Sequence, residues 1–289
     1  MHMKSAWITG ANGLIGNYLV QSAPKFALHW QVRPLTRRDF DLLDFATVRR
    51  EFERDQPQLI IHCAAMAVVG EAQRNPELAR RVNVAVTQFL AELAAEIPFV
   101  FFSTDVVFDG RKGNYIETDP PNPLHVYGET KAEAEAMVLK NSRHLIVRTS
   151  LNAGKSISGI RGFDEQLRRA LQSGQGTTLF KDEYRSPIPA EETARAVWDL
   201  VGKNCTGIYH VAGAEKLSRL EIGELLIRHW PEVTAEIRSA RIKSGLAKDF
   251  PGPTRALDTS LDISKAQNRL STPLPKFSAW TGAHLTGAF

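Results

Sequence analysis

The sequence predicts an α/β protein with a doubly wound parallel sheet and a smaller C-terminal substrate lobe. Over the first 150 residues, short apolar runs alternate regularly with amphipathic runs. The run QLIIHCAA does not alternate between apolar and polar residues, which is typical of a strand buried on both faces. A glycine-rich turn follows the first apolar run. Strand and helix in regular succession require right-handed crossovers, which place the strands in one parallel sheet of the Rossmann type.

The elements of the first half follow in order from these patterns. The strand SAWITG leads into a helix over about 14–22, and the strand WQVRPLT precedes the helix ATVRREFERD. After QLIIHCAA, a longer helix is predicted over about 76–97, because its apolar residues recur on one face. The strand FVFFST, a loop rich in Gly, Asp and Pro, a helix that carries Lys131, and the strand HLIVRTS complete the alternation.

The second half has a looser pattern. It opens with the glycine-rich loop LNAGKSISGIRG, and helices are predicted near 163–173, 190–202 and 218–229, with short strands at TTLF and GIYHVAG. We expect residues 151–289 to form mainly a substrate-binding lobe at the carboxyl edge of the sheet, where ligands of α/β proteins bind. Part of this half is expected to return to the first domain.

Composition and charge exclude several classes of protein. No apolar run approaches the roughly 20 residues that a membrane helix needs, and the start MHMKSAWITG enters a strand at once, so neither a membrane span nor a signal peptide is expected. The net charge of +4 includes arginine pairs with acidic neighbours, which is typical of solvated helix faces and not of a nucleic-acid surface. Cys63 and Cys205 lie far apart and the histidines occur singly, so we expect no disulfide, no metal site and a cytoplasmic location.

The glycine loop between the first strand and the first helix is a strong binding signal. WITGANGLIG places Gly10, Gly13 and Gly16 in this turn. Glycine permits positive φ and close backbone approach, and the free N–H groups at the helix start then face a pyrophosphate. Because the triplet lies in the first strand-turn-helix of an alternating chain, we expect residues 1–150 to form an NAD(P)-binding domain.

The segment after the second strand helps to distinguish an NADP site from an NAD site. NAD sites usually place an acid there for the ribose 2′-hydroxyl, whereas LTRRDFDLLD presents Arg37 and Arg38 first. Guanidinium groups complement a 2′-phosphate, so we favour NADP, and Asp39 leaves NAD open. The other predicted cofactor contacts are Asn12, Leu14 and Ile15 in the glycine loop, Asp41 and Leu42 near the adenine, and Ala64 and Ala65 after the third strand.

Two further motifs carry a resemblance to a known family. FFSTDVVFDG ends the fourth strand, and PPNPLHVYGETKAEAE follows after a short loop. In this order, and together with the glycine loop, they resemble the extended short-chain dehydrogenase/reductases and, more narrowly, the dTDP-4-dehydrorhamnose reductase family. The matching residues are Ser103, Thr104, Asp105, Val107, Phe108, Asp109 and Gly110 in the first motif, and Pro123, Leu124, Tyr127, Gly128, Thr130 and Lys131 in the second.

The resemblance implies a catalytic trio of Thr104, Tyr127 and Lys131. Reduction of a ketone needs a hydride donor on one face and a proton donor at the oxygen, and an ordinary tyrosine pKa of about 10 is too high for this near neutrality. The Lys131 ammonium, four residues after Tyr127 on the same helical face, is expected to stabilise the phenolate. By resemblance, Tyr127 is the general acid, Lys131 tunes it and holds the nicotinamide ribose, and Thr104 orients the carbonyl.

Departures from the family pattern fall on the expected substrate pocket. The family usually has tyrosine after Thr-Asp, where this chain has Val106, and an aromatic-rich run after Arg-Thr-Ser, where it has LNAG. Less aromatic surface removes contacts that would select a pyranose. We expect Asp105, Val106 and Asn152 to flank the substrate. Arg185 is a candidate ligand for a nucleotide diphosphate, with a solvent-exposed surface role as the alternative.

These residues predict an NADP(H)-dependent oxidoreductase of the EC 1.1.1 type, with the 4-keto group of a nucleotide-activated deoxysugar as its candidate substrate. One alternative is a cofactor-binding regulatory subunit, since the β subunit of methionine adenosyltransferase resembles this family. Another is a sugar-nucleotide epimerase or dehydratase; a dehydratase generally needs an acid pair after the threonine, and Val106 counts against it. No nucleic-acid or membrane partner is expected. Homodimer formation and the use of magnesium are left open.

Overall fold

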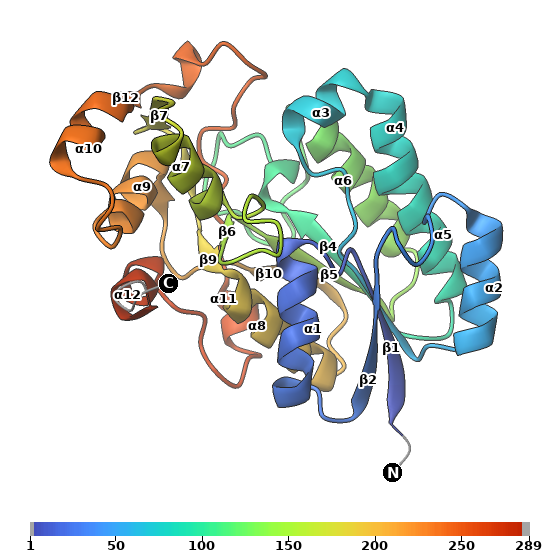
Figure 1. The fold of residues 1–289 in the computed structure, drawn as a ribbon. Coiled ribbons are helices and arrows are strands. Elements are labelled where there is room, and N and C mark those ends of the chain that lie inside the picture. Colours follow the sequence, from blue (N-terminus) through green and yellow to red (C-terminus); the bar gives the residue numbers. More distant parts are fainter. Residues whose placement is uncertain (1–2, 285–289) are drawn as a thin grey trace.

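A six-stranded parallel sheet with helices on both faces forms the centre of the computed structural model, which describes residues 3–284 (Figure 1). The strand order is β10-β5-β4-β3-β1-β2, so the predicted doubly wound α/β fold is confirmed. The outer ends of the two predicted domains, residues 1–2 and 285–289, lie outside the described residues. The strands of this sheet are β1 (Lys4–Thr9), β2 (Trp30–Leu35), β3 (Leu59–His62), β4 (Phe99–Thr104), β5 (Leu145–Thr149) and β10 (Gly207–Val211).

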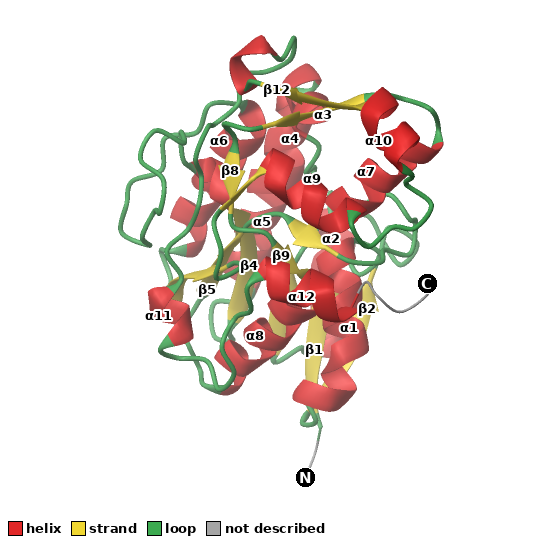
Figure 2. Cartoon of the chain, turned by 90° about the vertical axis from the view of Figure 1, so that its left-hand side faces the viewer, coloured by secondary structure: helices red, strands yellow, loops and turns green. Residues whose placement is uncertain are grey.

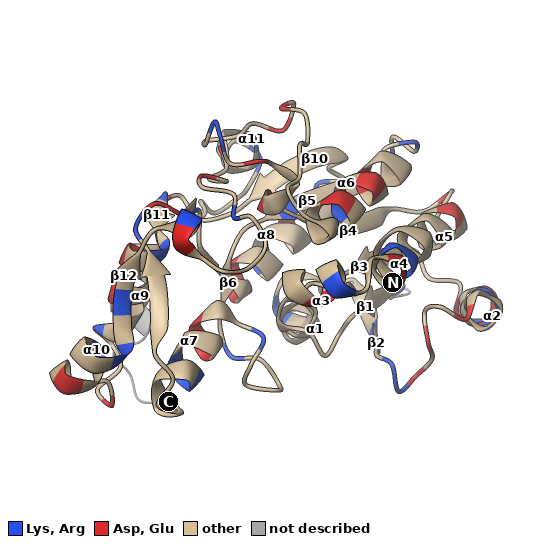
Figure 3. Ribbon diagram, turned by 90° about the horizontal axis from the view of Figure 1, so that it is seen from above, with Lys and Arg blue, Asp and Glu red and all other residues tan. Residues whose placement is uncertain are grey.

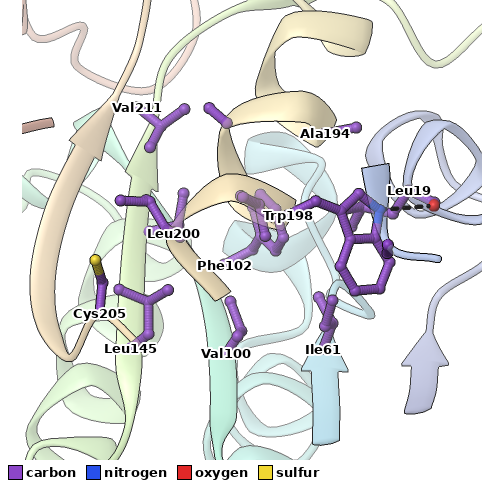
Figure 4. Close-up of a cluster of buried hydrophobic side chains, with 14 of the residues drawn as sticks. Leu19, Ile61, Val100, Phe102, Leu145, Ala194, Trp198, Leu200, Cys205 and Val211 are labelled. Carbon is purple, nitrogen blue, oxygen red and sulfur yellow. Dashed lines mark hydrogen bonds between the residues drawn. The ribbon is translucent and has the colours of Figure 1, made fainter. Parts of the chain in front are cut away.

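One face of the sheet is covered by α1 (Leu14–Phe26) and α8 (Ala190–Gly202), which pack against each other. Trp198 of α8 is buried between them, as its place in a helical pattern predicts, and its indole N–H donates to the carbonyl of Leu19 over 3.0 Å (Figure 4). Apolar side chains from the central strands complete this layer. A helix from the second half of the chain therefore contributes to the core beneath the glycine loop.

The opposite face carries α2 (Phe45–Asp55), α5 (Val86–Leu93) and α6 (Val126–Val138), together with α3 (Val69–Arg74) and α4 (Pro76–Arg80). The helix predicted over about 76–97 is confirmed as a continuous helical run that ends at Leu93, and a π-helical turn, Arg81–Ala85, joins α4 to α5 within it. A π turn inserts one residue without disturbing the apolar pattern on either side, so periodicity alone does not reveal it. The short helix α3 was not predicted.

The smaller lobe contains three two-stranded sheets beside its helices (Figure 2). The predicted helices near 163–173 and 218–229 are confirmed as α7 (Phe163–Gln172) and α9 (Arg219–Ile227), and the strand TTLF as β7 (Thr177–Phe180). Strands of two residues carry too little periodicity to be predicted. The remaining elements are β6 (Asn152–Ala153), β8 (Tyr184–Arg185), β9 (Ile188–Pro189), β11 (Leu217–Ser218), β12 (Ile242–Gly245), α10 (Ala235–Arg241), α11 (Ser264–Gln267) and α12 (Phe277–His284), with 3-10 turns at Asp105–Val107 and Ala247–Asp249.

Part of the second half returns to the main sheet. β10 pairs in parallel with β5, with Ile208 opposite Ile146, and α8 lies over the sheet. We propose that the cofactor-binding unit consists of residues 1–150 together with the segment from α8 to β10. Within residues 3–284, no helix is both long enough and apolar enough to cross a bilayer.

Candidate functional site

The carboxyl ends of β1 and β3 lie side by side at the point where the strand order reverses direction. From β1 the chain crosses to β2 on one side, and from β3 it continues to β4 and β5 on the other. Ligands of open α/β sheets bind in the crevice that such a reversal creates. Figure 3 views the molecule from the edge at which the strands end, and shows Lys and Arg interspersed with Asp and Glu over the helices.

The glycine loop occupies one side of this crevice. Gly10 has a φ of +67°, and a Cβ there would lie 2.7 Å from the backbone nitrogen of Ala64. A Cβ on Gly16 would overlap the carbonyl oxygen of Gly10, so the first turn of α1 packs directly on the loop. Gly13, the N-cap of α1, has no side-chain cap, and the first turn of the helix contains no acidic residue. The unpaired N–H groups at this helix start are therefore free to bind an anion.

The loop after β2 presents its two arginines to solvent. Asp39 turns back and accepts hydrogen bonds from the backbone N–H and the hydroxyl of Thr36, both 2.8 Å long. These bonds lower the pKa of Asp39. Arg37 and Arg38 are exposed. Both hydrogen bonds end on Oδ2, so Oδ1 of Asp39 can still accept a hydrogen bond and Asp39 leaves NAD open.

The other predicted cofactor residues lie in the loops that follow β1, β2 and β3 or in the first turn of α1. The backbone N–H of Ala64 donates to the Thr9 hydroxyl over 3.3 Å, which ties the end of β3 to the end of β1. Asp41 is exposed and accepts from the backbone N–H of Leu43. Asn12 is exposed, Leu14 is buried, and Ile15, Leu42 and Ala65 are half-buried.

Thr104 and Tyr127 come together where β4 ends and α6 begins. The Thr104 hydroxyl lies close enough to the Tyr127 phenol to affect its pKa, and Thr104 is buried. A Cβ on Gly128 would overlap the carbonyl oxygen of Val106, so only glycine lets α6 start directly against the turn after β4. His125 caps α6, its Nδ1 accepting from the backbone N–H of Gly128 over 3.1 Å.

Lys131 lies one turn further along α6 and is 3% exposed. Its ammonium lies 3.9 Å from the centre of the Phe101 ring, and within residues 3–284 it makes no hydrogen bond or ion pair. A buried ammonium without a hydrogen-bond acceptor is costly, so this site is suited to a ligand that brings hydroxyl groups. The ribose of a dinucleotide is such a ligand.

The electrostatics of Tyr127 differ from the sequence-based expectation. Burial and the charge of Asp105 raise the pKa of Tyr127 to about 12, and the neighbouring Thr104 hydroxyl acts in the opposite direction. Burial also lowers the pKa of Lys131 to about 7, although Glu135 opposes this. The expected lowering of the Tyr127 pKa by Lys131 is therefore wrong for the protein without cofactor, because burial disfavours both charged forms. The phenol is firmly protonated, the state that a proton donor requires.

Asp105 is held by the protein on several sides. Its carboxylate accepts hydrogen bonds from the hydroxyls of Thr104 (3.2 Å), Ser150 (2.7 Å) and Thr259 (3.1 Å), and Arg185 lies 3.7 Å away. Asp105 is buried. This network joins β4, β5 and the C-terminal segment, and the separation of Thr259 from Asp105 in the chain hid it from sequence analysis.

The predicted substrate residue Asn152 makes its hydrogen bonds within the protein. The Asn152 amide donates to Thr149 and to the Ser150 carbonyl, and accepts from the Thr193 hydroxyl over 2.7 Å. Asn152 thus fastens the end of β5 to α8, and its polar atoms are engaged within the protein. Val106, by contrast, is half-buried beside Thr104.

Arg185 is 5% exposed, which contradicts a role on the surface. Its guanidinium donates to the carbonyls of Tyr184 and Ala256 and forms an ion pair with Glu183 over 3.0 Å. Because the guanidinium is engaged by these groups, it is not available to bind a diphosphate. It instead braces Asp105 from the side of the smaller lobe.

Asn83 is a further residue whose position sequence reasoning missed. It lies in the π turn, accepts from the backbone N–H of Met66 over 2.8 Å and donates to the Thr130 hydroxyl over 3.0 Å. It thereby connects the loop after β3 to the catalytic helix. Among residues 3–284, no three His, Cys, Asp or Glu side chains are grouped so as to hold a metal ion.

Comparison with known proteins agrees with this arrangement. A probable low-salt glycan biosynthesis reductase, Agl14, of Haloferax volcanii is 31% identical over 93% of each chain. A dTDP-4-dehydrorhamnose reductase of Sinorhizobium fredii is 28% identical over 95% of this chain and 94% of its own. Methionine adenosyltransferase 2 subunit beta of Xenopus laevis is 30% identical over 76% of this chain and 70% of its own.

Solved structures share the fold. The crystal structure of dTDP-4-dehydrorhamnose reductase from Bacillus anthracis in complex with NADP aligns with a TM-score of 0.86 at 22% identity, over 97% of this chain and 98% of its own. Residues 3–286 match the family described as RmlD substrate binding domain. The resemblance inferred from the motifs is therefore confirmed, and the chain belongs to the RmlD substrate-binding domain family.

Proposed function

We propose that this protein is a cytoplasmic NADP(H)-dependent reductase that acts on a carbonyl, with the 4-keto group of a nucleotide-activated deoxysugar as its substrate. The observation that carries the proposal is the meeting of a protonated, half-buried Tyr127 with Thr104, one helical turn before the buried Lys131. The reductases among the relatives support the substrate class.

The residues present suit a bound dinucleotide. The N–H groups of the glycine loop would hold the pyrophosphate, the exposed Arg37 and Arg38 the 2′-phosphate, and the Lys131 ammonium the nicotinamide ribose. When bound, NADPH supplies the hydride. The exposed guanidinium groups of Arg37 and Arg38 favour NADP over NAD. Asp39 leaves NAD open, because both of its hydrogen bonds from Thr36 end on Oδ2 and its Oδ1 can still accept from a ribose 2′-hydroxyl.

The chain's own residues supply the proton and the orientation. Tyr127 donates its phenolic proton to the substrate oxygen as negative charge develops there, and the Thr104 hydroxyl donates a hydrogen bond to the same oxygen. Asp105 fixes the Thr104 hydroxyl through their 3.2 Å hydrogen bond until substrate arrives.

The proposal is tested by mixing the purified protein with NADPH and dTDP-4-dehydrorhamnose and following NADPH oxidation and the sugar product. Activity that is lost in Tyr127→Phe while NADPH still binds is the expected result. If NADPH binds without being oxidised, this substrate is ruled out.

A second candidate function is a cofactor-binding regulatory subunit. It is favoured by the 30% identity to methionine adenosyltransferase 2 subunit beta, which is close to the identity of the reductases. Co-purification of a partner enzyme, with its activity unchanged by Tyr127→Phe, would support this candidate. The complete trio of Thr104, Tyr127 and Lys131 favours the reductase.

A further inference from the structure

Glu135 lies one helical turn after Lys131 on α6 and is as deeply buried, at 2% exposed. Residues four apart on a helix are neighbours on one face, with about 5–6 Å between their Cβ atoms. A buried carboxylate is costly unless it is paired and hydrogen-bonded. Because Glu135 lies one turn after the lysine that is proposed to hold the cofactor, its negative charge can act on that lysine.

The other titratable groups that face Lys131 are uncharged near neutrality. From β3 and the residue after it come His62, whose pKa is lowered by burial to about 3, and Cys63, whose pKa is raised by burial. From α6 comes Tyr127, which is protonated. From β4 comes the ring of Phe101, which carries no charge. Within residues 3–284, the negative charge that acts on Lys131 therefore comes from Glu135.

Arg148 of β5 holds Glu135 in place. Its Nε and Nη2 donate to the two carboxylate oxygens over 3.0 and 2.7 Å, and the guanidinium also donates to the Glu117 carbonyl over 3.3 Å. The Arg148 side chain is 1% exposed and stacks on the ring of Phe108. Because both carboxylate oxygens are bonded to Arg148, Glu135 acts on Lys131 by its charge without drawing the ammonium away from the crevice.

We propose that Glu135 is a positioning residue that keeps the Lys131 ammonium charged and directed at the cofactor, and that Arg148 fixes Glu135 for this role. This inference rests on the proposed function for the identity of the cofactor, but not for that of the ketone. Binding of NADPH should weaken as pH rises and Lys131 loses its proton. Without Glu135, the weakening should begin at a lower pH.

The test measures the Kd of NADPH in the absence of any ketone, between about pH 6 and 9, for the wild-type protein and for Glu135→Gln. We expect the weakening to begin about one pH unit lower in the variant, so that at pH 8 its Kd is about tenfold higher. Glu133→Gln is the matched control, since it removes the same charge from the exposed side of the same helix. Its profile should equal that of the wild type.

Glu135→Gln leaves Arg148 as an unpaired buried charge. Should the variant not fold, the double variant Glu135→Gln/Arg148→Gln removes both charges and is expected to show the same displacement. A folded single or double variant with an unmoved profile overturns this inference alone. A wild-type protein that binds no NADPH overturns the proposed function, and this inference with it.

Discussion

Replacing Lys131 by methionine should make the cofactor-free protein more stable. Methionine keeps a long apolar side chain against the Phe101 ring and removes the buried ammonium. Burial lowers the pKa of this lysine from its ordinary value of 10.5 to about 7. The unfolded chain therefore binds the proton more tightly than the native chain does.

The magnitude follows from these two values. The difference between 10.5 and about 7 corresponds to roughly 4 to 5 kcal/mol, at about 1.4 kcal/mol for each tenfold change in the proton equilibrium. Native stability is lost as pH falls from about 10.5 to about 7, and the loss is constant below that range. We therefore expect Lys131→Met to raise the free energy of unfolding by about 2 to 4 kcal/mol at pH 7, with most of the gain disappearing near pH 10.

Urea denaturation of the cofactor-free proteins at both pH values measures this difference. Lys140→Met is the control, because Lys140 is exposed just after the end of α6 and should show no such dependence on pH. NADPH should stabilise the wild type much more than Lys131→Met. A variant that is less stable at pH 7, or whose gain does not change with pH, would refute the argument that the ammonium is held at a cost until the cofactor binds.

Three other outcomes are expected. Tyr127→Phe should lower kcat for carbonyl reduction by about 10²- to 10⁴-fold and leave the Kd of NADPH within about twofold, as steady-state kinetics and titration would measure; an equal loss in both would argue against its role as proton donor. Arg37→Ala combined with Arg38→Ala should raise the Kd of NADPH by about 10- to 100-fold and leave that of NADH nearly unchanged, and equal effects on both dinucleotides would contradict the assignment of the 2′-phosphate site. Gly16→Ala should lower Tm and abolish NADPH binding, since its Cβ would overlap the Gly10 carbonyl, and near-normal binding by calorimetry would show that α1 can move away.

Local patterns predicted the parts of the fold and site that local chemistry determines. The glycine triplet, the buried strands and the helix that carries Tyr127 each depend on a few neighbouring residues, and all appear in the structure where they were expected. The π turn and the two-residue strands depend on contacts with distant segments. Such contacts cannot be predicted from the spacing of residues in the sequence.

The predicted site residues divide in the same way. Asn152 and Arg185 looked like free ligands because their partners, Thr193 and Ala256 among them, lie far away in the chain. The direction of the Tyr127 pKa depends on burial, which spacing does not determine. Asp105 was placed beside the substrate by its motif, whereas the three hydroxyls that hold it are visible only in three dimensions.

Gly128 packs against the backbone of Val106, so the turn after β4 docks α6 through its backbone and leaves the Val106 side chain uninvolved. The contact involves the carbonyl oxygen of Val106 and therefore does not depend on which side chain that residue carries. Position 106 can change its side chain while the helix that holds Tyr127 keeps its docking point. If Val106 lies beside the substrate as proposed, saturation mutagenesis at this position should alter substrate choice and leave the position of Tyr127 unchanged. The side chain at position 106 is therefore independent of the backbone contact that docks α6.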